Sequence, residues 1–148
     1  MKYSLANYIL TIKANDPAMN GIFGSSNSVS VGGEGSYTDS INISMNSQIW
    51  QTTGFATGGW VHDKSLDRTG MATVSLSQLS DRVAKFKTLC NMYFSGDYEG
   101  LTMILNDSDG NEVAKCEDCF VTKIPDQSFG SKASMQNWSF TCGKITIN

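Results

Sequence analysis

Most of the chain alternates apolar and polar residues with a period of two, which is typical of β-strands that bury one face. In segment 40–45, for example, Ile41, Ile43 and Met45 fall on one side of the predicted strand. Glycine, asparagine, aspartate and serine bound these runs, as expected where strands end in turns. The pattern predicts strands at 8–14, 28–31, 40–45, 70–76, 101–107, 112–124 and 137–147. We therefore expect a mainly β protein.

One segment, at about 78–94, departs from this period and has helical spacing. Its apolar residues recur at steps of four and three and form one stripe: Leu79, Val83, Phe86, Cys90 and Tyr93. Ser77 or Ser80 can cap the start of the helix, and Gly96 follows its end. We expect one amphipathic helix that packs this stripe against the core.

Segment 46–69 fits neither pattern and is predicted to be a long extended loop. It is rich in glycine and threonine and carries Trp50, Phe55 and Trp60. Loops longer than about 12–15 residues are usually functional or disordered, and three aromatic residues argue against disorder. We expect this loop to be a contact surface.

Charged residues are unevenly distributed along the chain. Segments 17–33 and 40–62 contain no Asp, Glu, Lys or Arg, although both have strand character. Soluble monomers protect strand edges with charges or prolines, so these stretches favour a protein that works in a self-assembly. The alternative is that they are buried within the fold. The net charge of −3 and the pI near 5.0 argue against a basic face that binds nucleic acid.

The length of 148 residues favours one domain with a core that needs neither disulfides nor metal. The N-terminus lacks an apolar run of signal-peptide quality, and no segment approaches the about 20 apolar residues of a membrane span. We expect a soluble protein that is made in the cytoplasm and does not associate with membranes.

The four cysteines are Cys90, Cys116, Cys119 and Cys142. Only Cys116 and Cys119 have a metal-like spacing, and a structural zinc site needs a second pair. In an extended strand, residues three apart point to opposite faces. We expect free thiols, mostly buried with one exposed, and no cofactor.

No catalytic motif is present. His62 lies beside Asp63, but no nucleophile elbow or recognisable nucleophilic cysteine accompanies them. The acidic segment 106–112 resembles the start of a calcium loop, yet its sixth position is Glu112 rather than glycine. Asp109-Gly110 in that segment is a strong hairpin turn. We expect a structural turn there, and a protein that is not an enzyme.

The order of features in the C-terminal half is more specific than any single motif. Segment 67–93 combines a strand that begins with glycine and the amphipathic helix. Segment 101–147 combines a strand, an acidic hairpin, a strand, a Lys-x-Pro-Asp-x-Ser-Phe-Gly turn and a final strand with tryptophan. The residues of the last two features are Lys123, Pro125, Asp126, Ser128, Phe129, Gly130 and Trp138. In this order and spacing the chain resembles the tail tube proteins of contractile-tailed bacteriophages, a group related to prophage, pyocin and type VI secretion tube proteins.

The resemblance implies a small antiparallel β-sandwich or barrel with one flanking helix, forming a single tail-tube-like domain over 1–148. It also implies rings of six subunits that stack into the inner tail tube, through which viral DNA passes into the host without specific binding. The implied partners are further copies of the chain and the sheath, baseplate hub and tape-measure proteins of the tail. The implied location is the virion tail, assembled in the host cytoplasm.

Within this architecture, the final strand completes a sheet, with Trp138, Phe140 and Cys142 on one face. The turn from Pro125 to Gly130 is expected to set its register, with Gly130 at positive φ. The aromatic residues of segment 46–69 are expected to be anchors that contact a neighbouring ring.

Two other functions remain open from the sequence. A secretion-tube subunit of the type VI kind would share the same geometry. A carbohydrate-binding β-sandwich could stack sugars on Trp50 and Trp60 and hold calcium with Asp107 and Asp109.

Overall fold

The computed structural model describes residues 2–19, 21–23 and 28–148. In these residues the chain is mainly β with one α-helix, as predicted. The strands are β1 (Ile9–Ala14), β2 (Ser28–Gly32), β3 (Thr38–Met45), β4 (Trp50–Gly54), β5 (Trp60–Lys64), β6 (Gly70–Ser77), β7 (Leu101–Asn106), β8 (Glu112–Val121) and β9 (Met135–Ile147). The helix is α1 (Asp81–Ser95), and two short 3-10 turns occupy Leu5–Asn7 and Pro17–Met19.

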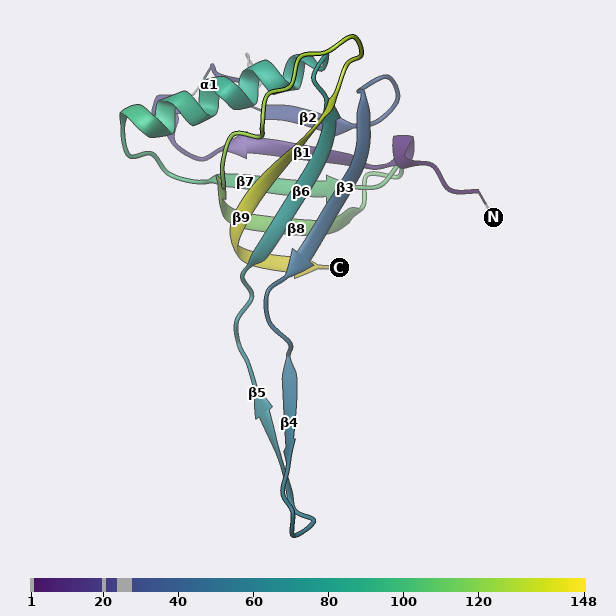
Figure 1. The fold of residues 1–148 in the computed structure, drawn as a ribbon, viewed down its shortest axis with the longest axis vertical. Helices are drawn as coiled ribbons and strands as arrows, with labels where there is room; N and C mark the ends of the chain where they lie inside the picture. The colour runs from purple at the N-terminus through teal and green to yellow at the C-terminus, as the bar shows by residue number, and fades with distance from the viewer. Residues whose placement is uncertain (1, 20, 24–27) are drawn as a thin grey trace.

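Seven strands form one antiparallel sheet in the order β2-β1-β7-β8-β9-β6-β3. The long strand β9 bends this sheet into a half-barrel, because its first part pairs with β6 and its last part with β8. In Figure 1, β1, β2, β7 and β8 run across the view, and β3, β6 and the upper part of β9 cross them. The chain therefore curls one sheet into two crossing layers.

The core lies between these layers and under α1. The apolar face predicted for β6 is present, since Ala72, Val74 and Leu76 are fully buried. The ring of Phe86 on α1 lies 5.4 Å from that of Trp138 and 5.6 Å from that of Phe140, centroid to centroid. These contacts fix the helix against β9, the strand that joins the two layers.

The prediction that Leu79 belongs to the buried face of the helix is wrong. Leu79 is 67% exposed and lies in the turn before α1. The helix begins at Asp81 because the Ser80 hydroxyl accepts a hydrogen bond from the backbone N–H of Arg82, at 3.4 Å. Leu89 supplies the missing apolar contact and is fully buried.

The rest of the predicted stripe faces the core. Val83, Phe86 and Cys90 are buried, and Tyr93 is partly buried. Tyr93 contacts the ring of Phe120 on β8, at 5.6 Å between centroids. The apolar face of α1 therefore contacts β9 through Phe86 and β8 through Tyr93, nearer the end of the helix.

Segment 46–69 is extended, as predicted, but its middle is a β-hairpin rather than an irregular loop. Strands β4 and β5 pair in a separate two-stranded sheet. Figure 1 shows this hairpin projecting away from the body, at the end opposite α1.

Two expectations about the cysteines are wrong. All four thiols are buried, and none is exposed. Cys116 and Cys119 share the interior face of β8 because the strand contains an extra residue between them. Asp118 there has a φ of +55°. Leu101 of β7 is paired with Cys119 and Met103 with Cys116, so β7 advances two residues where β8 advances three. Such a bulge reverses the alternation that follows it.

The segment between β8 and β9 carries the Pro125–Gly130 turn and has no regular secondary structure. Gly130 is not among the residues with positive φ, so that expectation is wrong. Side chains tie the segment down instead. The Gln127 amide donates to the Pro125 carbonyl at 2.9 Å, and the Gln136 amide on β9 donates to the Gln127 amide oxygen at 3.2 Å. Phe129 is exposed.

Candidate assembly surface

The two edge strands of the large sheet are β2 and β3. Strand β2 lies within the charge-free segment 17–33, and β3 lies within the charge-free segment 40–62 from Ser40 onward, after the charged Asp39. Strand β3 pairs only with β6 among the described residues. Its Ile41 and Ile43 pack against the core, while Ser40, Asn42 and Ser44 are exposed. From Ser40 onward β3 has no charged side chain, so it lacks the usual protection of an edge strand.

The edge at β2 is different because α1 covers part of it. Figure 1 shows α1 lying beside β2. The Arg82 guanidinium on α1 donates to the backbone carbonyl of Ser30 at 3.0 Å. Arg82 is itself held by the Asp81 carboxylate at 2.7 Å, and this hydrogen bond lowers the pKa of Asp81. The side chain of Arg82 on α1 thus satisfies the Ser30 carbonyl at the β2 edge. Strand β3 is therefore the less protected edge.

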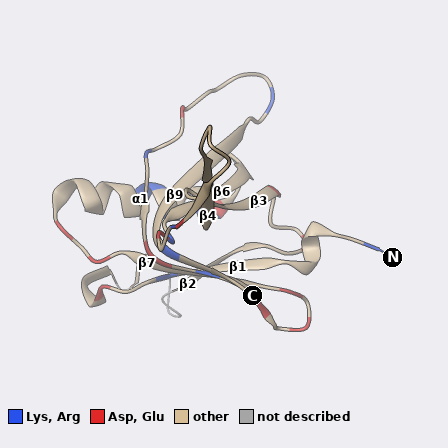
Figure 2. Cartoon of the chain, turned by 90° about the horizontal axis from the view of Figure 1, so that it is seen from below, with Lys and Arg blue, Asp and Glu red and all other residues tan. Residues whose placement is uncertain are grey.

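The hairpin continues directly from β3. It is exposed along both strands, and its five-residue turn is closed by the Phe55 N–H, which donates to the Gly59 carbonyl at 2.9 Å. Gly58 has a φ of +95° in this turn, a conformation that favours glycine. The hairpin tip, residues 55–60, has no charged residue, as the tan ribbon in Figure 2 reflects.

Cross-strand pairs stiffen the hairpin between its tip and its base. The Thr52 hydroxyl and the His62 Nδ1 lie 2.8 Å apart on directly opposed residues. The Lys64 ammonium lies 5.7 Å from the centroid of the Trp50 ring, within the range of a cation–π contact. Such pairs are the unit of stabilisation in a two-stranded ribbon.

The base of the hairpin is bound to the body by a small polar network. The Asp67 carboxylate accepts hydrogen bonds from the Ser47 hydroxyl and from the Thr69 hydroxyl and N–H, at 2.5, 2.7 and 2.9 Å. These bonds lower the pKa of Asp67 to about 2. The Asn46 N–H also donates to the Thr69 carbonyl at 3.0 Å. This network sets the direction in which the hairpin leaves the sheet.

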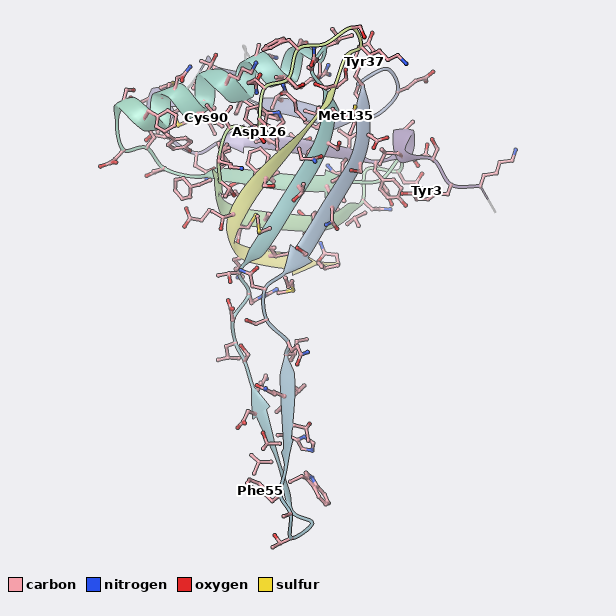
Figure 3. All side chains as sticks on the ribbon, viewed as in Figure 1. Tyr3, Tyr37, Phe55, Cys90, Asp126 and Met135 are labelled. Atoms are coloured by element: carbon pink, nitrogen blue, oxygen red, sulfur yellow. The ribbon has the colours of Figure 1, made fainter. Side chains whose placement is uncertain are left out.

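The hairpin carries the three aromatic residues that the sequence singled out, with Trp50 at the start of β4 and Phe55 and Trp60 at the tip. Trp50, Phe55 and Trp60 are each more than half exposed. Figure 3 shows Phe55 near the hairpin tip, far from Asp126 and Cys90 in the body. The turn residues from Pro125 to Gly130 and the buried Trp138 therefore belong to another part of the molecule. The exposed Ile49, Val61 and Leu66 add to the apolar surface of this arm and were missed because only aromatic residues were considered.

A second apolar feature is a hollow of about 450 Å³ at the C-terminal end of α1. Tyr93, Phe94, Tyr98 and Ile124 are among its lining residues. The Tyr93 hydroxyl donates to the Glu99 carbonyl at 2.9 Å. Burial, with a smaller effect of the Asp16 carboxylate, raises the pKa of Tyr93 to about 12, so this phenol stays neutral and acts as a donor.

The acidic turn between β7 and β8 uses its oxygen ligands for its own backbone. Asp107 Oδ1 accepts hydrogen bonds from the N–H groups of Asp109 and Asn111, both at 3.0 Å. Across the described ranges, no group of three or more His, Cys, Asp or Glu side chains is arranged to hold a metal ion. The predicted hairpin turn is present, with Asn106 and Glu112 paired across it.

His62 and Asp63 are neighbours on β5, so their side chains project to opposite faces of the hairpin. His62 bonds to Thr52 instead of to a carboxylate.

None of the helical segments in the described residues is long and apolar enough to span a membrane. The two surface features suited to assembly are the unprotected edge at β3 and the projecting apolar hairpin of β4 and β5.

Solved structures with a similar fold include parts of an extracellular contractile injection system and of the anti-feeding prophage. The sheath–tube complex of an extracellular contractile injection system, PVC, in its extended state, contains a chain with a TM-score of 0.58 at 10% identity, over 100% of this chain and 92% of that one. The baseplate of the anti-feeding prophage, AFP, contains one with a TM-score of 0.57 at 5% identity, over 100% and 96%. The terminating cap of the AFP tube contains one with a TM-score of 0.54 at 13% identity, over 100% and 93%. At these identities the likeness concerns the fold.

No curated protein matches this sequence. A family model does: the model of the bacteriophage PhiTE tail tube protein matches residues 6–148. This match covers nearly the whole chain, and it confirms the resemblance inferred from the order of strands, helix and turns. The chain belongs to the family of the bacteriophage PhiTE tail tube protein.

Proposed function

We propose that this tail tube protein is the protomer of six-membered rings that stack into the inner tube of a contractile tail, the conduit for viral DNA into the host. The observation that carries the proposal is the unprotected β3 edge, which runs directly into the projecting hairpin. A structural role of this kind needs surfaces rather than a reactive centre, in keeping with the structural character of the family.

The ring contact in this proposal is made by sheet edges. An uncharged edge strand is a template for pairing with another chain, and joining sheets into one closed barrel removes such edges. Strand β3 of one copy therefore pairs with the sheet of the next copy around the ring. A ring of six is in keeping with the AFP baseplate, whose structure was symmetrised six-fold.

The stacking contact is made by the hairpin. It projects from the end of the body opposite α1 (Figure 1), so a copy in one ring reaches toward the α1 end of a copy in the next. A head-to-tail contact that does not close generates an extended assembly. Trp50, Phe55 and Trp60 are the anchors of this contact, since aromatic side chains dominate interface energies.

The remaining partners follow from the same role. The tube passes DNA without specific binding, and a net charge of −3 suits a lumen that repels phosphate. A sheath, a baseplate hub and a tape-measure protein are the further partners of the tube in the tail. The similar chain in the PVC sheath–tube complex supports the first of these partners. The assembly takes place in the host cytoplasm.

The test separates the two contacts by mutation. Purified protein is examined by negative-stain electron microscopy and by sedimentation at low and high concentration. We expect rings with a central channel, and stacked tubes as concentration rises. Lysines in place of the exposed edge residues Asn42 and Ser44 put two charges on an uncharged edge strand, which is how soluble proteins block pairing at such an edge. We expect a more than tenfold higher concentration for ring formation. The matched control places the same two charges at the exposed Ser108 and Asn111.

The hairpin is tested with serine at Trp50, Phe55 and Trp60 together. These side chains are exposed, so the monomer should retain its stability, while rings form and no longer stack. A wild-type protein that is monomeric at every concentration contradicts the proposal. An edge variant that assembles like its control contradicts the role of β3.

A further inference from the structure

Three of the four cysteines meet where β8 and β9 pair. Cys116 and Cys119 on β8 and Cys142 on β9 are all buried in the core. Cys119 is paired directly with Cys142 across the two antiparallel strands. Their Sγ atoms lie 3.2 Å apart. No part of the tube function described above uses these thiols.

The pairing geometry is compatible with a covalent bond. Directly opposed residues of antiparallel strands have Cα atoms about 4.5–5.5 Å apart, which lies within the about 4.4–6.8 Å that a disulfide spans. Both side chains point to the same interior face. We propose that Cys119 and Cys142 close into a cross-strand disulfide when the protein meets a low-molecular-weight disulfide oxidant.

The bulge in β8 turns both of its cysteines toward the interior face, where Cys142 lies. The extra residue Asp118 turns the Cys119 side chain inward. The alternation of buried and exposed residues in β9 is interrupted at the same place, since Cys142 and Ile145 are three residues apart and both buried. Glycines make room for the bulge. A Cβ atom on Gly100 would lie 2.8 Å from a carboxylate oxygen of Asp118, and one on Gly143 would lie 3.4 Å from the Asp118 Cβ.

The register selects Cys119 over the third thiol. Cys116 is paired with Ile145, so its position relative to Cys142 is diagonal. Cys116 also lies close enough to Cys142 for that thiol to raise its pKa, but a disulfide between these two residues would have to span the longer diagonal separation between the strands. Cys90 lies on α1, outside this pair of strands.

The chemistry is thiol–disulfide exchange with oxidised glutathione. One protein thiolate attacks the glutathione disulfide, forms a mixed disulfide and releases one glutathione. The second protein thiolate then attacks the protein sulfur of that mixed disulfide and releases the other. In total two protein thiols are oxidised to one disulfide, and one glutathione disulfide is reduced to two glutathione molecules. The hydrogen bond to Cys142 and burial raise the pKa of the Cys119 thiol, so exchange requires transient opening of the strands.

The bond would constrain the least regular part of the C-terminal half. It closes a loop from Cys119 to Cys142 that contains the entire segment between β8 and β9. A loop of this length restricts the unfolded chain enough to raise the melting temperature by about 5–10 °C. On the proposed function, the bond would form after the tube leaves the reducing cytoplasm, but its formation does not require assembly.

The test uses the full chain in a glutathione redox buffer at slightly alkaline pH. One sample of reduced folded protein is incubated in the buffer. A second is unfolded in urea and refolded by dilution into the same buffer, which exposes every thiol to the oxidant before the core closes. Remaining thiols are alkylated after denaturation, and disulfide-linked peptides are identified by mass spectrometry. We expect the refolded sample to contain the Cys119–Cys142 disulfide with Cys90 and Cys116 alkylated, and the folded sample to reach the same state more slowly.

Two variants control the assignment. Cys119→Ala should lose the disulfide and the gain in melting temperature, whereas Cys116→Ala should retain both. A refolded wild-type protein with four free thiols in the most oxidising buffer would overturn the proposal, and so would a dominant bond from Cys116 or between chains. The wild-type measurement decides the question even if a variant fails to fold. Electron microscopy of the reduced protein tests tube assembly separately, so either proposal can fail without the other.

Discussion

Replacing Trp138 by alanine tests whether the contact between α1 and β9 holds the two layers together. The Trp138 side chain is fully buried, and its ring lies 5.4 Å from that of Phe86 at an interplanar angle of 56°. Phe86 in turn lies edge-on to Phe140 at 5.6 Å. Large-to-small changes of a buried aromatic residue cost about 3–5 kcal/mol. Since domains of this kind have a free energy of unfolding of about 5–15 kcal/mol, we expect a large loss of stability and failure to assemble.

The indole nitrogen allows a sharper version of the same experiment. Trp138 Nε1 is buried and has no hydrogen-bond partner among the described residues. Leaving a buried donor unsatisfied costs about 1–3 kcal/mol. Trp138→Phe removes this donor and keeps an aromatic ring against Phe86, so part of the loss in packing is offset. We expect Trp138→Phe to cost less than about 2 kcal/mol.

Urea unfolding followed by far-UV circular dichroism measures both variants, and the exposed Trp50 and Trp60 do not interfere with this signal. The midpoint and the slope of each transition give the change in the free energy of unfolding. A cost below about 1 kcal/mol for Trp138→Ala would refute the central position assigned to this residue. A cost for Trp138→Phe as large as that for alanine would show that Nε1 makes a hydrogen bond that matters.

Three further predictions concern other parts of the fold. Ser80→Ala removes the N-cap of α1 and should cost about 1 kcal/mol in urea unfolding, whereas Ser80→Asp should restore most of it. Gly70→Ala places a Cβ against the Ser44 carbonyl and the Ile145 side chain, so it should displace β3 from β6 and cost about 1–3 kcal/mol, with faster amide exchange in β3. Asp67 has a folded pKa of about 2 against an ordinary value of 3.8. Its contribution to the hairpin base should therefore be constant above about pH 4 and be lost between about pH 4 and 2; an NMR titration of its carboxyl with a midpoint near 3.8 would contradict the network.

Local signals in the sequence were sufficient for most elements of the fold. The period of two placed the strands, since an antiparallel sheet with one buried face repeats every second residue. The step of three and four placed α1, and its cap was one of two serines proposed for that role. Asp109-Gly110 lies in the turn between two strands that pair with each other. Each of these features depends on neighbours within a few residues.

One error was local. Leu79 is apolar and in phase with the helix, but the cap at the neighbouring Ser80 excludes it from α1. Other errors arose where residues distant in sequence decide the outcome. Cys116 and Cys119 share a face because a bulge shifts the register of β8 against β7. Segment 46–69 forms a ribbon because Asn46 and Ser47 on one side bond to Thr69 and Asp67 on the other.

The candidate assembly surface divides in the same way. The sequence by itself determined that charges are absent from two strand-like segments and that three aromatic residues lie in one of them. Only the tertiary structure decided that these segments contain the two edge strands of one sheet, apart from the first two residues of β3. It also decided that Arg82 covers part of the β2 edge and that β3 leads into an exposed arm. The physical reason is that strand composition is local, whereas the position of a strand in a sheet depends on which distant strands pair beside it.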